Sequence, residues 1–362
     1  MAFKFSSLMS KRSPTLVGLD ISTSGVKVVV LEGTASKPVV RAYAIVPLNR
    51  GDLNNGIIQK AESVTRAVSA ALIAARIKIK NVALAMPSQT AITSTLSYPK
   101  GFKAQELEQY VESDAANQLP FPIDEVRLDF CRTGATLPNG EEEVLLVAAK
   151  REATDARLEA VEHAGLTPKV LDIESLCTER AITQLSKTLP KSGKGLLVAL
   201  IDIGSDTLTL TVVRDKKVVF ERDQPFGGYR LTQDIAKKFN LTPEEAERKK
   251  RLSDLPPEYP QTLLKPFLHS AGEAASRALQ LFYTSTPYSR VDHVYLAGGS
   301  ALLPGIVEAV IQYTDSPVEL VKFSGVFALA RSVSQRQFDR DSPMLGVALG
   351  LAIRSFDSAT AA

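Results

Sequence analysis

Two stretches half a chain apart share one pattern of hydrophobic and polar positions. Residues 16–31 read LVGLDISTSGVKVVVL, and residues 196–213 read LLVALIDIGSDTLTLTVV. Each is an apolar strand that ends in Asp, followed by a short turn of small residues and a second β-rich strand. Because the repeat distance is half the chain, the pattern indicates two related lobes and not a short-period solenoid.

The segments after each hairpin follow a similar plan. Residues 39–48 predict a third strand after the first hairpin, and residues 215–228 predict one after the second, with a turn at 215–217. Apolar residues at helical spacing then predict helices over 57–76 and 229–239. Thr242 and Glu245 form a capping-box pattern, with Pro243 at the first position of a further helix. This alternation predicts an α/β layered fold.

A different run of elements lies between the two repeats. Strands are expected over 81–87, 90–99, 125–135 and 141–150, with helices over 104–118 and 154–166. We interpret the greater part of this run, residues 88–168, as a small inserted α+β subdomain. Further along, the pattern predicts a helix over 270–286, a strand, glycine pair and helix over 291–310, and a last helix near Pro343.

Composition and charge exclude several classes of protein. The 43 basic and 40 acidic residues nearly balance, and we expect the basic run 247–251 to be a solvated helix face, so no nucleic acid partner is expected. Cys131 and Cys177 lack metal-site spacing and suggest a reducing compartment. No apolar run reaches the roughly 18–20 residues that span a bilayer, and residues 1–12 are too short and polar for a signal peptide. We therefore expect a cytoplasmic protein with frayed ends that reaches a membrane only through partners.

The turn after the first repeated strand is a candidate phosphate site. Successive backbone N–H groups of a tight turn can cradle phosphate, and the hydroxyls of Ser22, Thr23 and Ser24 add donors without bulk. Lys27 could project toward the same phosphates. Taken alone, the segment favours an ordinary β-hairpin with polar turn residues.

The second copy of the turn strengthens this interpretation. Gly204 and Ser205 follow Asp202 as the small residues follow Asp20, so two facing turns could clamp a polyphosphate. The two aspartates would then lie across a Mg²⁺ ion and act mainly through its waters. One of them could also orient the attacking water in phosphoryl transfer.

A glycine pair provides a third signal. Gly298, Gly299 and Ser300 follow a predicted strand, and two glycines would let the backbone approach a flat ligand closely. The chain has neither a GxxxxGK[ST] nor a GxGxxG pattern, so other common phosphate motifs are absent.

In this order the three motifs resemble those of the actin/Hsp70/FtsA superfamily. DISTSG (20–25) and DIGSDT (202–207) are similar to its paired phosphate motifs, and YLAGGSALLPG (295–305) is similar to its adenosine motif. Ala246-Glu247-x-x-Lys250 resembles the helix that contacts adenine and ribose. The resemblance implies an actin-like ATPase fold with two lobes around a cleft for ATP and Mg²⁺. The implied catalytic and metal residues are Asp20 and Asp202, and the implied nucleotide contacts are Ser22, Thr23, Ser24, Lys27, Gly204, Ser205, Glu247, Lys250, Gly298, Gly299 and Ser300.

Longer stretches resemble the PilM family of type IV pilus assembly proteins. They are TLVGLDIST (15–23), ESDAANQLPFP (112–122), FGG-x-x-LT (226–232) and LGLAIRSFD (349–357). The resemblance implies a first lobe of residues 14–87, 169–190 and 325–357 and a second lobe of residues 195–324. It also implies that a groove beside the insert binds the N-terminal cytoplasmic peptide of PilN. The inner-membrane pilus platform would be assembled on that pair, with pilus motor components as further candidate partners.

Two other functions of the same superfamily stay open at this point. A small-molecule kinase would need a polar substrate pocket, and no sugar-binding cluster stands out. An FtsA-like cytoskeletal protein would carry a basic amphipathic C-terminal helix, whereas this chain ends in SFDSATAA. Asp206 stands where the superfamily has a small residue, which leaves the hydrolysis rate open. Nucleotide binding is the expected main role, and a weak ATPase activity is left open.

Overall fold

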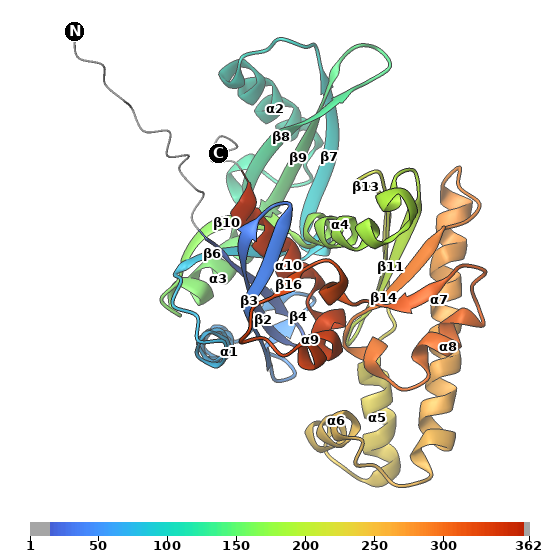
Figure 1. The fold of residues 1–362 in the computed structure, drawn as a ribbon. Helices are drawn as coiled ribbons and strands as arrows, with labels where there is room; N and C mark the ends of the chain where they lie inside the picture. The colour runs from blue at the N-terminus through green and yellow to red at the C-terminus, as the bar shows by residue number, and fades with distance from the viewer. Residues whose placement is uncertain (1–14, 358–362) are drawn as a thin grey trace.

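Two similar β-sheets form the framework of the molecule in a computed structural model that describes residues 15–357 (Figure 1). The expectations for residues 1–12, for residue 14 and for the tail 358–362 lie outside the described residues. The first sheet contains β1 (Val17–Ser22), β2 (Gly25–Thr34), β3 (Lys37–Pro47), β6 (Asn81–Met86), β10 (Thr167–Ile173) and β16 (Ala328–Leu329). The second contains β11 (Leu197–Ile203), β12 (Leu208–Arg214), β13 (Lys217–Gln224), β14 (His293–Ala297) and β15 (Val318–Leu320).

The strand orders confirm the predicted duplication. The first sheet has the order β10-β6-β1-β2-β3-β16, and the second has β15-β14-β11-β12-β13 when read in the same direction. In each, an antiparallel three-strand meander is followed by two strands that join it in parallel. The turn between β12 and β13 falls at Asp215 and Lys216, which both have the positive φ of a tight hairpin turn.

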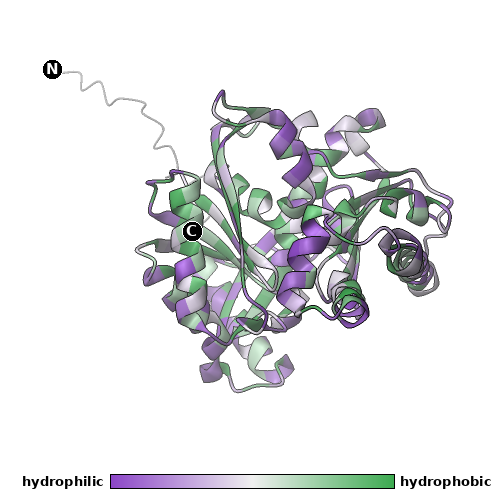
Figure 2. Cartoon of the chain, turned by 90° about the horizontal axis from the view of Figure 1, so that it is seen from below, coloured by the Kyte–Doolittle hydropathy of each residue, from purple (hydrophilic) through white to green (hydrophobic). Residues whose placement is uncertain are grey.

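Helices cover and join the two sheets, as Figures 1 and 2 show. They are α1 (Ala61–Ala74), α4 (Glu174–Leu185), α5 (Gly228–Phe239), α6 (Pro243–Leu252), α7 (Lys265–Ser285), α8 (Ile306–Ile311), α9 (Gln335–Asp341) and α10 (Gly346–Ala352). Apolar side chains of α4 and α10 share one buried cluster with strands of both sheets. A Cβ at Gly18 of β1 would lie 2.1 Å from the carbonyl oxygen of Ala348, so the glycine lets α10 pack directly on the strand.

Two helices begin several residues later than the sequence predicts. The helix expected over 57–76 begins at Ala61, because Ile57–Ile58 forms strand β5 and pairs with β4 (Leu53–Asn54). The helix expected within 291–310 begins only at Ile306, after a 3₁₀ turn at Gly299–Leu302 and the αL residue Gly305. In both places a short local structure replaces the first turns of the expected helix.

A third, smaller sheet projects from the first lobe at the top of Figure 1. Its strands β7 (Ala91–Tyr98), β9 (Glu142–Lys150) and β8 (Val126–Thr136) pair in that order, and α2 (Ala104–Gln118) packs on them through a separate apolar cluster. Helix α3 (Arg151–Glu162) instead packs with α1 in the core of the first lobe. We therefore propose that the insert is limited to residues 88–150. None of the helices within residues 15–357 has the length and apolar character needed to cross a membrane.

Candidate functional site

The two repeated turns line a cavity of about 660 Å³ between the sheets. Ten of the residues predicted as site residues lie on its wall: Asp20, Ser22, Thr23, Ser24, Lys27, Asp202, Gly204, Ser205, Gly298 and Gly299. They come from the ends of β1, β11 and β14 and from the strands and turns that follow. The structure therefore brings together segments that are as far as about 280 residues apart in the chain. The parallel pairing of β11 and β14 places the second and third motifs at the same edge of their sheet.

The first turn is stabilised by a buried ion pair. Asp20 and Lys27 are register partners on β1 and β2, and Lys27 Nζ lies 2.7 Å from Asp20 Oδ2. The ammonium group also donates a hydrogen bond to Ser22 Oγ. Asp20 and Lys27 are 4% and 7% exposed, so burial strengthens an interaction that would be weak at the surface. The pair holds the first turn in place at the cavity wall.

The second turn is supported by the start of α5. The backbone N–H of Gly228 donates to the carbonyl oxygen of Gly204 at 3.0 Å, and that of Tyr229 donates to Ser205 at 2.9 Å. A Cβ at Gly227 would lie 2.2 Å from the Ser205 carbonyl oxygen. The FGG segment at 226–228 is therefore needed because only glycine lets α5 approach this turn.

Gly298 brings the third motif against the second turn. Its φ is +87°, which favours glycine, and a Cβ at this position would lie 2.4 Å from Asp202 Oδ1. The adjacent Gly299 has open space around it, with Met344 Sδ 4.0 Å from a built Cβ. Of the two glycines, only Gly298 is required by close packing.

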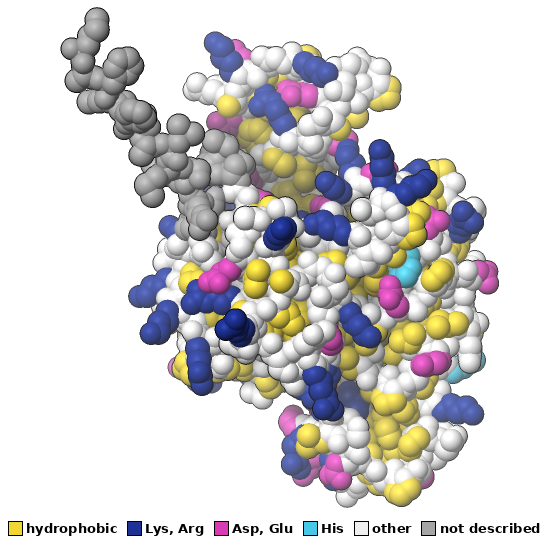
Figure 3. Space-filling model, viewed as in Figure 1, with side chains coloured by type: hydrophobic (Ala, Val, Ile, Leu, Met, Phe, Trp, Pro, Cys, Tyr) yellow, Lys and Arg dark blue, Asp and Glu magenta, His cyan; other side chains and the backbone are white. Residues whose placement is uncertain are grey.

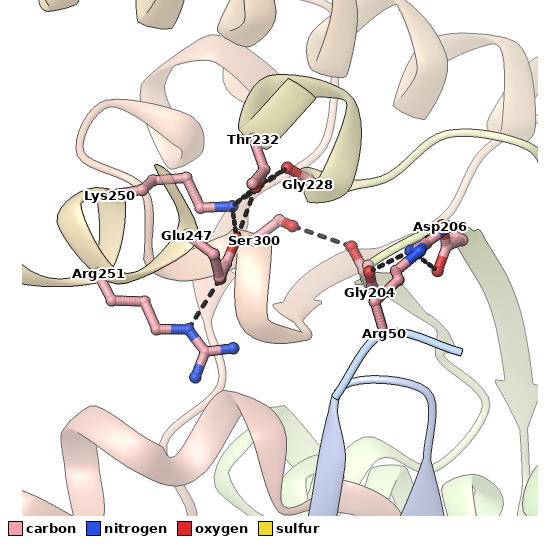
Figure 4. Close-up of polar contacts among 10 residues, drawn as sticks. Arg50, Gly204, Asp206, Gly228, Thr232, Glu247, Lys250, Arg251 and Ser300 are labelled. Carbon is pink, nitrogen blue, oxygen red and sulfur yellow. Dashed lines mark hydrogen bonds and ion pairs between the residues drawn. The ribbon is translucent and has the colours of Figure 1, made fainter. Parts of the chain in front are cut away.

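Three predicted nucleotide contacts do not line the cavity. Ser300 is buried and donates a hydrogen bond to the Gly204 carbonyl oxygen at 2.9 Å, so it supports the second turn from behind. Glu247 and Lys250 on α6 form an ion pair at 2.6 Å, and Lys250 also donates to the Gly228 carbonyl oxygen at 3.1 Å (Figure 4). Their direct contact with a nucleotide stays a prediction.

The α6 network connects this helix to the start of α5. Thr232 donates to Glu247 Oε2 at 2.6 Å, and Arg251 Nε lies 2.8 Å from Glu247 Oε1. Burial opposes ionisation of Glu247, but Lys250 and the surrounding donors prevail and lower its pKa to about 2. The carboxylate is thus ionised and fully engaged in holding α6 near the second turn.

Sequence reasoning missed Glu174, which lies on the cavity wall at the first residue of α4. Burial, and to a lesser degree the nearby Asp20, raise its pKa, while Arg157 and Lys27 lower it, and the net result is a pKa of about 7. Arg157 is 1% exposed and donates to the carbonyl oxygens of Ile21 (3.1 Å) and Gly56 (2.7 Å). The available signal was the acidic residue directly after β10, since β10 runs parallel to β6 and β1 and its end reaches the same edge.

The carboxylates of the cavity suit a divalent cation that keeps most of its waters. Burial and the nearby Asp20 raise the pKa of Asp202, Lys27 lowers it, and the net result is a pKa of about 6. Within residues 15–357, neither Asp202 nor Glu174 has an ion-pair partner, and no three acidic, His or Cys side chains form a ready-made metal site. Mg²⁺ fits such a donor set, because it uses few direct carboxylates and needs phosphate and water as its other ligands.

Comparison with known proteins agrees with this architecture. The family model described as type IV pilus assembly protein PilM matches residues 18–356. The cell division protein FtsA of Bacillus subtilis (strain 168) is 27% identical over 256 residues, which are 65% of this chain and 57% of that protein. The ethanolamine utilization protein EutJ of Salmonella typhimurium is 28% identical over 107 residues, or 35% of its length. The chain thus spans less than two thirds of these two relatives.

Solved structures show the same relationship over nearly the full length. A structure titled PilM-PilN type IV pilus biogenesis complex matches with a TM-score of 0.79 and 27% identity, covering 95% of this chain and 99% of that one. EutJ from Carboxydothermus hydrogenoformans matches with a TM-score of 0.56 and 18% identity, covering 94% and 90%. These likenesses confirm the predicted actin-like ATPase fold. With the family model covering almost all of the described residues, the chain belongs to the PilM family of type IV pilus assembly proteins.

Proposed function

We propose that this chain is a nucleotide-dependent scaffold for the inner-membrane platform of the type IV pilus. In this role it binds Mg²⁺–ATP between its lobes and the N-terminal cytoplasmic peptide of PilN beside its insert. The observation that carries the proposal is the similarity to the PilM-PilN complex, which covers 95% of this chain and so includes both the cavity and the insert. Binding through PilN would place the protein in the cytoplasm at the inner membrane. Pilus motor components are further candidate partners.

The cavity supports the nucleotide half of the proposal. The turns after β1 and β11 line the cavity from the two lobes, and their backbone N–H groups and hydroxyls would supply the donors that a polyphosphate clamp requires. Asp20 and Asp202 would hold the waters of Mg²⁺, which neutralises phosphate charge when bound. Glu174, with its pKa near 7, could accept a proton from an attacking water. These groups are consistent with a weak ATPase activity.

The insert supports the peptide half. Figure 3 shows hydrophobic side chains in a shaded recess between the projecting subdomain and the body of the molecule. Strands β7 and β8 are the two edges of the small sheet, so their unpaired backbone groups could add an extended peptide as a further strand. Tyr110 and Ile123 are 52% and 39% exposed on the same subdomain and offer apolar contacts.

Contacts between the insert and the second lobe offer a path for coupling. Lys217 Nζ of β13 lies 3.1 Å from Glu143 of β9, and Gln89 donates to Asp223 at 2.6 Å. Gln89 and Asp223 also line the cavity. A nucleotide that changes the angle between the lobes would therefore change these contacts, and with them the position of the small sheet.

A calorimetric titration with a synthetic PilN N-terminal peptide tests the proposal. The peptide is expected to bind in the micromolar range or tighter, with an affinity that differs between samples with and without Mg²⁺–ATP. A variant carrying Lys217→Ala should bind the peptide with a smaller dependence on ATP, and Lys216→Ala, at the adjacent turn position, is its matched control. A protein that binds neither the peptide nor ATP would refute the proposal.

A further inference from the structure

We propose that Arg50 is a phosphate-binding residue of this cavity, and that Asp206 competes with the nucleotide for its guanidinium group. The inference rests on the proposed nucleotide function and adds to it a recognition residue outside the three sequence motifs. Arg50 lies in the connection between β3 and β4 of the first lobe, while Asp206 belongs to the second turn on the opposite lobe.

The geometry places the Arg50 guanidinium group at the second turn, residues 204–207. Arg50 Nη1 lies 2.7 Å from Asp206 Oδ1 and 3.5 Å from Ser205 Oγ, as Figure 4 shows for the contact with Asp206. All three residues line the cavity. A phosphate seated on the turn at 204–207 would therefore be within reach of Arg50 without a large movement.

The backbone that carries Arg50 is rigidly anchored. Asp52, which is 1% exposed, accepts hydrogen bonds from the Asn49 N–H at 3.0 Å and from Ser63 Oγ at 2.6 Å. The Arg50 guanidinium lies over the Tyr229 ring, 3.6 Å from its centroid. Because its loop is anchored by Asp52 and its guanidinium stacks on Tyr229, the Arg50 side chain is pre-organised, which reduces the entropy lost when it binds a ligand.

Arg50 is the cationic side chain of the cavity that is available to bind phosphate. Lys27 and Arg50 are the two cationic side chains among the described residues that line it, against the carboxylates of Asp20, Glu174, Asp202, Asp206, Glu221 and Asp223. Lys27 is already engaged with Asp20 and Ser22 inside the first lobe. The Arg50 and Asp206 side chains are 44% and 38% exposed, so their ion pair is weak and can be exchanged. Guanidinium groups bind phosphate in a bidentate manner, and the phosphate carries more charge than Asp206.

Competition between Asp206 and phosphate predicts opposite effects for the two partners. We would measure the affinities of Mg²⁺–ATP and of adenosine, which lacks phosphate, by displacement of a fluorescent adenine nucleotide. Arg50→Ala should lower the affinity for Mg²⁺–ATP by roughly tenfold and the affinity for adenosine by less than about twofold. Asp206→Asn should raise the affinity for Mg²⁺–ATP by about twofold or more, because the carboxylate that competes for Arg50 is removed. Arg41→Ala, which removes the exposed Arg41–Glu32 pair of the first lobe, is the matched control and should change neither affinity.

The same measurements separate this inference from its alternatives. If Arg50→Ala and Asp206→Asn both weaken Mg²⁺–ATP, the pair is a structural bridge between the lobes and the inference is wrong. Equal losses for ATP and adenosine, or no tightening by Asp206→Asn, would overturn it as well. The tightening is decisive, because misfolding of a variant cannot produce it. A wild-type protein that binds no Mg²⁺–ATP would overturn the proposed nucleotide function itself, and this inference with it.

Discussion

Gly298 and Asp202 are in such close contact that a Cβ at position 298 would lie 2.4 Å from Asp202 Oδ1. The contact joins the second and third motifs, at the end of β11 and the end of β14, which are parallel neighbours in the second sheet. The carboxylate of Asp202 is therefore positioned by the backbone of the third motif. An aspartate at this site depends on a glycine almost one hundred residues later in the chain.

This contact predicts different effects for the two adjacent glycines. Gly298→Ala should displace Asp202 and force a positive φ on alanine, at a cost of about 1–3 kcal/mol in unfolding free energy. Gly299→Ala, where a Cβ has open space, should be tolerated. Chemical denaturation measures the unfolding free energy of both variants. Equal stability of the two variants would contradict the packing described for Gly298.

The raised pKa of Asp202 predicts a pH-dependent effect on stability. Its pKa in the folded protein is about 6, above the ordinary 3.8, so the folded state holds the proton more tightly than the unfolded state. Stability is therefore lost as pH rises from about 4 to about 6. Asp202→Asn should avoid this loss and stabilise the protein by about 3 kcal/mol at pH 8, with the difference disappearing below pH 4.

Denaturation curves at several pH values check the prediction. Asp234→Asn, which changes an exposed carboxylate on α5, is the control and should show no such trend. A difference between Asp202→Asn and wild type that stays constant from pH 4 to pH 8 would contradict the assignment of the buried charge to Asp202.

The N-terminus of α6 allows a test of local stability. Thr242 accepts a hydrogen bond from the Glu245 N–H and Glu245 accepts one from the Thr242 N–H at 2.9 Å, which completes the predicted capping box. Thr242→Ala should cost about 1 kcal/mol, whereas Thr242→Ser keeps the hydroxyl and should cost much less. Thermal unfolding compares the stability of the two variants. Similar losses of stability in both would show that the hydroxyl cap contributes little.

Glu174 on the cavity wall predicts a separation of nucleotide binding from turnover. If the protein hydrolyses ATP, Glu174→Gln should lower the rate by about 10²-fold or more while Mg²⁺–ATP affinity changes little, because glutamine keeps the shape but cannot accept the proton. Single-turnover phosphate release and equilibrium binding measure the two quantities. An unchanged rate would exclude Glu174 as the base.

Local sequence signals were sufficient for the repeated framework. The hairpins that carry Asp20 and Asp202 were predicted because a strand, a small-residue turn and a second strand are all encoded within a short segment. The box at Thr242 was predicted for the same reason. Ile57–Ile58 was wrongly assigned to a helix, because two apolar residues next to a helical pattern do not reveal that they pair with Leu53–Asn54.

Long-range packing explains what the sequence did not reveal at the site. Glu174 reaches the cavity because β10 lies parallel to β6 and β1, and Arg50 reaches it from a loop beside the second lobe, so both positions depend on a tertiary arrangement that local patterns do not specify. Glu247 and Lys250 matched a motif, yet the structure shows them engaged with Thr232 and Gly228. Their place beside the start of α5 follows from the packing of α6 on α5.

The paired-turn site is tested most directly by calorimetric titration of Mg²⁺–ATP into the wild-type protein and into Asp20→Asn and Asp202→Asn variants. We predict saturable binding by the wild type, and a loss of about tenfold in affinity in each variant when Mg²⁺ is present, since each removes one anchor for the hydrated ion. The losses should be much smaller in EDTA. Unchanged Mg²⁺-dependent affinity in both variants would contradict a nucleotide site shared between the two turns.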